Sequence, residues 1–468
     1  MPAFFHDDFL LGTKTARRLF HEHAAHLPII DYHSHVATAD VAANKAFTNL
    51  TELWLAPDPY KHRAMRAMGV NERYITGDAD PYDAFLQWAA TVPYTLGNPL
   101  HHWTAVELKT YFGVDELLCP ATAARIWETC NRQLQQESHR AAALLQRANV
   151  ECVCSSDRLL DDLGPHHALA DTSGAPRVLP SLRADDLLAV ESASFAEWTR
   201  ALGTATGLPV ATLDQLLQAV DRKLDHFAAH GCRLSDHGID VFDYVTTTRA
   251  EAARLYERRI NGEVTSAAES AQLRSSLLFA LGTAYARRGW TLQLHLGAQR
   301  QTSTRLRKIA GPAGGYATVG RPTDISRLCQ FLDDLECAGA LPRTIIFSLN
   351  PTDYAALAAL TGSFAEAGVA GKIQFGPAWW FNDHALGIRQ HFEALAHYGL
   401  LSTFVGMTTD SRSLLSMTRH DYFRRLLCDY LGEQVERGSF PADDVLLADY
   451  VRRLSYGNAR AFLFPSSS

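Results

Sequence analysis

The chain has 468 residues, 20% of them charged, and a formal net charge of −7. This length allows a large core, and the acidic balance argues against chain-wide attraction to nucleic acid or an anionic membrane surface. The eight cysteines form no CxxC pair, the N-terminal MPAFFHDDFLLG lacks the basic region of a signal peptide, and no apolar run reaches the ~20 residues of a membrane helix. We therefore expect a cytoplasmic protein without structural disulfides.

Short apolar runs that end in polar residues recur eight times along the chain. In chain order they are LPIIDYHSH, VECVCSSD, RVLPSLRAD, GCRLSDHG, TLQLHLGA, RTIIFSLN, KIQFGPAWW and STFVGMTTDSR. Apolar strands that alternate with helical stretches are typical of a parallel sheet covered on both faces. Eight such units predict an α/β fold, a distorted (β/α)8 TIM barrel, as a single domain over residues 1–468.

The connections between these runs differ greatly in length. Residues 37–148, after the first run, are rich in helix formers and aromatic residues, and we predict a large helical insertion that covers the barrel mouth. Residues 185–230 and 246–289 are also predicted to be helical, with a break at Asn261-Gly262. The glycine-rich segment 311–322 lacks the spacing of a phosphate loop and is predicted to be a mobile loop near the site.

Polar residues stand at or just after the ends of the predicted strands. In a (β/α)8 barrel the active site forms at the carboxyl ends of the strands, so we expect these side chains to converge. They are His33, His35, Arg183, His237, His295, Asn350, Trp380, Asp410 and Arg412.

Two histidines and an aspartate in this set suit a metal ion. His33 and His35 are two residues apart, so an extended chain points both rings the same way. Asp410 adds a hard carboxylate, and His295 ends another strand. Two imidazoles and a carboxylate suit Zn²⁺ or a similar divalent ion. The alternative is that these are packing histidines bonded to neighbouring carbonyls.

The arginines have a catalytic and a structural interpretation. Arg412 follows Asp410 by two residues, which pairs an acid/base carboxylate with a cation that stabilises negative charge on a substrate oxygen. The alternative is an internal salt bridge. Arg183 could bind a carboxylate in a bidentate fashion, or form a structural salt bridge with Asp185 or Asp186.

Aromatic residues near the predicted strand ends also have two interpretations. Tyr60, early in the insertion, could reach the barrel mouth as a hydrogen-bond donor, or lie on a solvated helix face. Trp379 and Trp380 could wall a sugar-sized pocket or pack beneath the insertion. The chain has no GxSxG motif, P-loop or dinucleotide fingerprint, so no nucleotide cofactor and no covalent serine or cysteine nucleophile are expected.

An HxH pair on the first strand, a histidine on the fifth and an aspartate on the eighth resemble the amidohydrolase superfamily. Within it, seven segments spread over nearly the whole chain resemble the uronate (glucuronate) isomerases. They are DYHSH, NPLHHWTAVELKTYFG, GCRLSDHGID, LQLHLGAQR, SLNPTDY, IQFGPAWWFND and FVGMTTDSRSLLSMTRHDYFRRLLC. Pro59 and Leu182 depart from the family pattern beside Tyr60 and Arg183, and we expect them to bear on substrate preference.

The resemblance implies an aldose–ketose isomerase of hexuronate catabolism, which interconverts D-glucuronate with D-fructuronate and D-galacturonate with D-tagaturonate through a cis-enediol. It implies one divalent ion per subunit, usually zinc, held by His33, His35 and Asp410. The implied catalytic residues are Asp410, Arg412, Tyr60 and His33, and the implied substrate contacts are Arg183, His295, His237 and Trp380. The implied partner is a small hexuronate, without nucleic acid or membrane, and a homo-oligomer is compatible with it.

Two other functions remain open from the residues alone. The same metal site could serve a mononuclear hydrolase of the amidohydrolase superfamily, which cleaves an amide, lactone or ester. A third interpretation is a sugar-acid-binding protein with an inactive site, but a binding-only site has little use for an acid/base carboxylate beside a metal.

Overall fold

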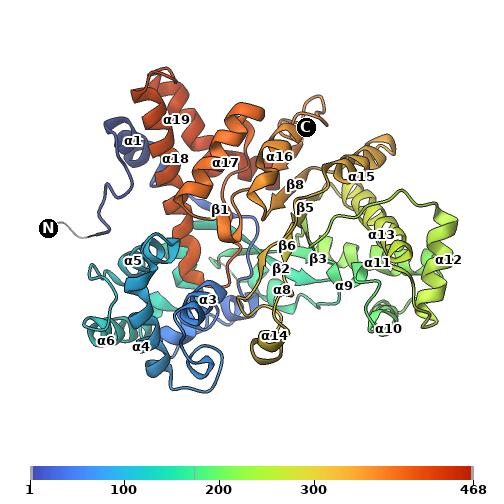
Figure 1. The fold of residues 1–468 in the computed structure, drawn as a ribbon, viewed down its shortest axis with the longest axis horizontal. Coiled ribbons are helices and arrows are strands. Elements are labelled where there is room, and N and C mark those ends of the chain that lie inside the picture. Colours follow the sequence, from blue (N-terminus) through green and yellow to red (C-terminus); the bar gives the residue numbers. More distant parts are fainter. Residues whose placement is uncertain (1–3, 173, 465–468) are drawn as a thin grey trace.

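The computed structural model describes residues 4–172 and 174–464, which form a curled parallel sheet surrounded by helices (Figure 1). The sheet has seven strands in the order β1-β2-β3-β4-β5-β8-β9, and every pair of neighbours is parallel. The strands are β1 (Ile29–Asp31), β2 (Val150–Arg158), β3 (Arg177–Arg183), β4 (Leu234–Ile239), β5 (Thr291–Leu296), β8 (Thr344–Ser348) and β9 (Ile373–Phe375). This architecture confirms the predicted distorted barrel.

The eighth predicted strand, residues 402–412, is not a strand. Residues 404–410 have no regular secondary structure, although they lie beside β1. The side chain of Asp31 accepts the Thr409 amide at 2.8 Å, which takes the place of a backbone partner. Gly406 and Asp410 have positive φ angles of 90° and 47°, which breaks the extended conformation. Backbone contacts resume only at the end, where the Asp410 amide donates to the His33 carbonyl at 3.0 Å.

The connection between β1 and β2 is helical, as predicted. Its helices are α2 (Thr38–Ala42), α3 (Pro59–Ala67), α4 (Pro81–Thr91), α5 (Pro99–Phe112), α6 (Ala123–Leu134) and α7 (Ala141–Arg147). Helices α3, α4 and α5 each begin with proline after an aspartate or asparagine, and the preceding side chain accepts an amide of the first turn. In α3 this cap is Asp58, which accepts the Tyr60 amide at 2.8 Å and so fixes the start of the helix.

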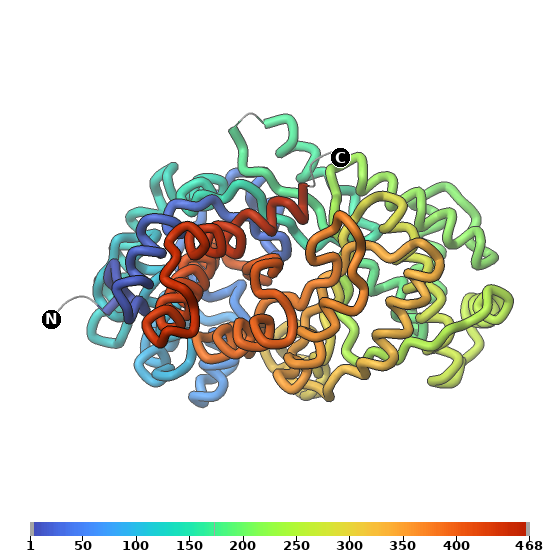
Figure 2. The backbone as a smooth tube through the Cα atoms, turned by 90° about the horizontal axis from the view of Figure 1, so that it is seen from above, coloured from blue at the N-terminus to red at the C-terminus, as the bar shows by residue number. Residues whose placement is uncertain are grey.

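The remaining helices follow in chain order, and Figure 2 shows the path of the whole backbone from above. They are α1 (Lys14–Leu19), α8 (Gly164–Ala170), α9 (Asp185–Leu188), α10 (Phe195–Thr206), α11 (Leu213–Ala229), α12 (Arg249–Ile260), α13 (Ala267–Arg287), α14 (Thr304–Ala310), α15 (Ile325–Cys337), α16 (Tyr354–Leu360), α17 (Ala385–Tyr398), α18 (Thr418–Glu436), α19 (Asp444–Arg452) and α20 (Asn458–Leu463). The Asn261-Gly262 break separates α12 from α13, as predicted.

Two short strands form a separate ribbon next to the sheet. They are β6 (Ala298–Gln299) and β7 (Thr318–Val319), which pair in antiparallel fashion. Near the two ends of the chain, α1 packs against α18 (Figure 1). Within the described residues, no helix is both long enough and apolar enough to cross a bilayer.

Candidate active site

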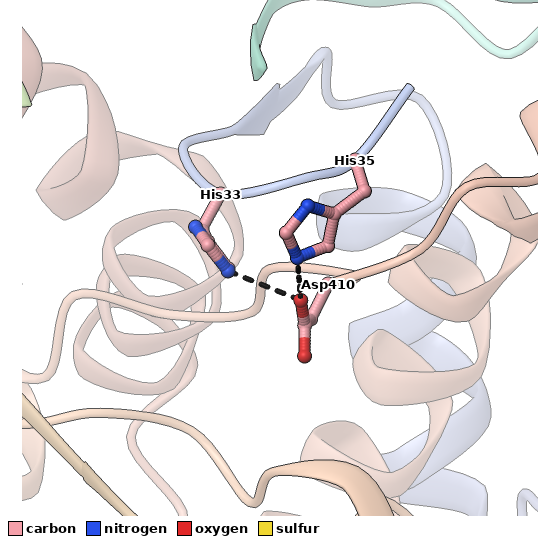
Figure 3. Close-up of side chains that lie close together, drawn as sticks. All are labelled: His33, His35 and Asp410. Carbon is pink, nitrogen blue, oxygen red and sulfur yellow. Dashed lines mark hydrogen bonds and ion pairs between the residues drawn. The ribbon is translucent and has the colours of Figure 1, made fainter. Parts of the chain in front are cut away.

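Three predicted metal ligands meet where β1 ends (Figure 3). His33 Nε2 lies 3.1 Å and His35 Nε2 lies 3.0 Å from the same carboxylate oxygen, Asp410 Oδ1. The extended chain after β1 aims both rings to one side, and the hydrogen bond between the Asp410 amide and the His33 carbonyl sets the aspartate opposite them. His33 is buried, the Asp410 side chain is 8% exposed, and His35 keeps more of its surface open.

The other oxygen of Asp410 accepts two indole N–H groups. Trp379 Nε1 donates to Asp410 Oδ2 at 2.6 Å and Trp380 Nε1 at 2.5 Å. Burial raises the pKa of Asp410, but the hydrogen bonds from His33 and His35 outweigh it and hold the pKa well below its ordinary value. Asp410 is therefore a carboxylate anion whose two oxygens face different partners.

Asp236 on β4 is a buried site residue that the sequence analysis missed. Its Oδ2 lies 2.6 Å from Arg183 Nη2, and its Oδ1 lies 2.9 Å from His295 Nδ1. Burial raises its pKa, but Arg183, then His33 and His295, hold the pKa well below the ordinary value. The signal in the sequence was a carboxylate inside an apolar strand, which requires a partner when buried.

His237 lies on the opposite face of β4 from Asp236, since strand side chains alternate. Its ring is fully buried, and its Nε2 lies 3.1 Å from the Tyr285 hydroxyl of α13. The structure therefore places His237 behind the sheet and not in the cavity. This corrects the expectation that His237 belongs with the residues that contact a substrate.

His295 lies on the inner face of β5, between aromatic and imidazole rings. Its ring stacks on Phe347 with centroids 4.2 Å apart, and the His33 centroid lies 4.4 Å away. Burial lowers the pKa of His295 to about 4, so the imidazole is neutral at pH 7. Together His33, Asp236 and His295 form a second buried group with the composition of a metal site.

A cavity of about 290 Å³ opens in front of Asp410. Of the predicted site residues, its walls include His33, His35, Tyr60, Arg183, His295, Trp380, Asp410 and Arg412. Asn350 lies off this cavity: its side chain donates to the Gly320 carbonyl at 2.9 Å and accepts the Thr352 amide at 3.0 Å. The glycine-rich segment also reaches the cavity, so its predicted place near the site is confirmed.

Four arginines line the cavity, two of which the sequence analysis did not single out. The two are Arg63 of α3 and Arg300, which follows β6 and forms an ion pair with Asp240. The guanidinium of Arg300 lies 5.9 and 5.5 Å from the ring centroids of Trp379 and Trp380. Among the described residues, no carboxylate pairs with Arg412, so the structural salt bridge considered for it is not formed there. The cavity therefore has a cationic wall.

Tyr60 faces the cavity from the first turn of α3. Burial, and then the charge of Asp410, raise its pKa well above the ordinary value, so the phenol keeps its proton. A protonated phenol in this position can donate a hydrogen bond to a bound oxygen.

Comparison with known proteins gives a consistent result over the whole chain. The family model described as glucuronate isomerase matches residues 1–463. A uronate isomerase of Vibrio vulnificus is 45% identical over 465 residues, which cover 99% of each chain. The crystal structure of a uronate isomerase from Thermotoga maritima superposes with a TM-score of 0.93 at 30% identity, over 98% of this chain and 100% of that one. A glucuronate isomerase from Caulobacter crescentus gives 0.92 at 25% identity, over 100% and 98%.

Proposed function

This chain belongs to the glucuronate isomerase family, and we propose from that premise how its cavity works. The chain is an isomerase of uronates. We propose that it interconverts D-glucuronate with D-fructuronate and D-galacturonate with D-tagaturonate in the cytoplasm, as a step of hexuronate catabolism. The observation that carries the proposal is one ionised carboxylate, Asp410, that faces a cavity of sugar size with a cationic wall.

The reaction moves a carbon-bound proton from C2 to C1 of the sugar through a cis-enediol, while the proton of the C2 hydroxyl passes to the oxygen at C1. A single carboxylate can carry the carbon-bound proton. We propose that Asp410 takes this proton from C2 and returns it to C1. Its Oδ1 faces two imidazoles, whereas its Oδ2 accepts hydrogen bonds only from two indole N–H groups and is the oxygen left for a substrate C–H. Negative charge then develops on the oxygen at C1, and Arg412, which no carboxylate pairs with among the described residues, can stabilise it.

The remaining cations and the phenol bind the rest of the substrate. Arg183 has its charge partly offset by Asp236, and its exposed edge can hold the uronate carboxylate in a bidentate fashion. Tyr60 keeps its proton and donates to a sugar oxygen. Trp380 and the neutral His295 form walls against which the open-chain sugar can pack.

A divalent metal ion, one per subunit, fits the residues His33, His35 and Asp410. Each offers a ligand atom, these atoms lie within 4.8 Å of one another, and both Nε2 atoms already point at one carboxylate oxygen. Three protein ligands with an open side match a catalytic site for Zn²⁺. When bound, such an ion would polarise a substrate oxygen and acidify the adjacent proton.

The test follows the sugar protons by NMR with metal-loaded protein and either D-glucuronate or D-galacturonate. The matching ketose should form, and the D410N variant should lose about 10²–10⁴-fold in kcat while remaining folded. Calorimetry of D410N with the sugar should still show binding. No ketose from either sugar would overturn the proposal and favour the metal-dependent hydrolase, for which lactones and esters would then be the substrates.

A further inference from the structure

Two segments far apart in the sequence meet at the edge of the cavity. One is the start of α3, and the other is the loop of residues 311–317. The loop belongs to a segment that leaves the sheet after β5. This segment contains β6, α14, the loop itself and β7, in that order. In Figure 1, α14 lies near α3. We call the start of α3 and this loop the roof. The cavity-lining residues of the roof are Pro59, Tyr60, Arg63, Pro312, Ala313, Gly315 and Ala317.

One face of α3 binds the backbone of the loop. Pro59, Arg63 and Arg66 are spaced by four and three residues, which places them on the same side of a helix. Arg63 Nη1 donates to the Ala317 carbonyl at 2.7 Å, and Arg66 Nη1 donates to the Gly314 carbonyl. The Glu72 carboxylate accepts hydrogen bonds from Nε and Nη2 of the same Arg66 guanidinium, at 2.8 and 2.6 Å. Two charged side chains thus attach the loop to the helix.

The third contact requires glycine at position 315. Its φ angle is +81°, and a Cβ atom there would overlap the carbonyl oxygen of Pro59. Gly311 in the same loop has a similar φ of +71°, but a Cβ atom there would meet nothing within 4 Å. The φ angle alone therefore does not distinguish the two glycines, and Gly311, with a ψ of −177°, also lies in a region almost confined to glycine. Only Gly315 lets the loop approach the first residue of α3 so closely.

We propose that Gly315 and Arg66 are positioning residues for the reaction. They seat the loop on the first turn of α3, so that Tyr60, the residue after Pro59, stays in the cavity that Asp410 lines. This inference rests on the proposed function, since it assumes that the hexuronate reacts in this cavity. A displacement of about 1 Å at a catalytic contact is enough to cost on the order of a hundredfold in rate.

The first experiment compares G315A with G311A in the full-length, metal-loaded protein. Both variants carry the strain of alanine at positive φ, but only G315A also forces the roof apart. We expect G315A to raise KM for D-glucuronate and to lower kcat, each by about tenfold or more. G311A should stay within about threefold of the wild type. Amide hydrogen exchange should quicken in residues 59–67 and 311–320 of G315A alone.

Arg66 gives an independent test because it does not line the cavity and so loses no substrate contact when replaced. R66M should reproduce the kinetic defect and the faster exchange, and R66K, which keeps one donor for the Gly314 carbonyl, should recover part of the activity. If G315A does not fold, the comparison of R66M with R66K still tests the inference. Wild-type kcat and KM in G315A or in R66M would overturn the inference, whereas an inactive wild type would overturn the proposed function instead.

Discussion

Trp380 donates its indole N–H to Asp410 at 2.5 Å, and both residues have a φ angle of 47°. Left-handed backbone in residues other than glycine is uncommon and is found where the surrounding structure enforces it, often at functional sites. Both residues line the cavity. The backbone conformation therefore restricts both Asp410, the proposed base, and one of its hydrogen-bond donors.

We expect W380F to shift the pH dependence of the reaction. The indole N–H stabilises the Asp410 anion, so its loss raises the pKa of Asp410, and the acid limb of kcat/KM should move to higher pH. W379F should act in the same direction, and the double variant more strongly. W290F, in which the replaced ring stacks on Tyr285 instead, serves as the control. An acid limb that stays in place in the double variant would contradict this role.

The ion pair between Asp236 and Arg183 should contribute strongly to stability. Asp236 is fully buried, so D236N removes the buried partner of the Arg183 guanidinium, which keeps only its longer contact with Asp185, and should lower the free energy of unfolding by about 3–5 kcal/mol. D185N is the matched control, because Asp185 is partly exposed and lies 3.6 Å from Arg183 Nε. The D185N change should lower the free energy of unfolding by less than about 1 kcal/mol. Urea unfolding of both variants measures the difference, and equal values would refute the prediction.

Arg419 is a buried cation that joins several parts of the site. Its guanidinium lies 3.9 Å from the centroid of the Trp103 ring. The Nη1 atom lies 3.6 Å from Asp383 Oδ2. The same atom donates a hydrogen bond to the carbonyl of Thr409, the residue before Asp410. We expect R419M to destabilise the fold by about 3–5 kcal/mol, because it leaves the buried Asp383 without its cation.

The loss in R419M should depend on pH. Burial raises the pKa of Asp383 to about 7, while Arg419 lowers it, so R419M should raise the pKa further. A folded-state pKa above the unfolded value means that stability falls as pH rises through the interval between the two. The loss should therefore be larger at pH 8 than at pH 5. Adding D383N should remove most of this difference, and a loss independent of pH would contradict the account.

The proposed metal site should lose affinity for zinc when one of its ligands is replaced. We expect H35N to bind Zn²⁺ at least 100-fold more weakly than the wild type, because replacing even an outer-shell partner of a ligand costs 10–100-fold. H167N is the control, since His167 is exposed on α8. Dialysis against a chelator followed by zinc titration measures both affinities. Removal of the metal should also lower the melting temperature of the wild type and of H167N. Equal zinc affinity in H35N would show that His35 is not a ligand.

The sequence by itself determined the class of fold and the centre of the site. Apolar runs ending in polar residues located all seven strands of the sheet, because burial on both faces leaves a continuous apolar signal. The two-residue spacing of His33 and His35 set both rings on one side. Whole-chain motifs pointed to the family that the comparisons show.

Only the tertiary structure decided which side chains share the cavity. Periodicity within one strand does not say which face is inside, and so the sequence points to His237 where Asp236 is the inner residue. The irregular path of residues 404–410 depends on the side chain of Asp31, nearly 400 positions away. The contact between Gly315 and Pro59 also joins distant segments. Such long-range contacts are set by the packing of the whole chain, which no local pattern encodes.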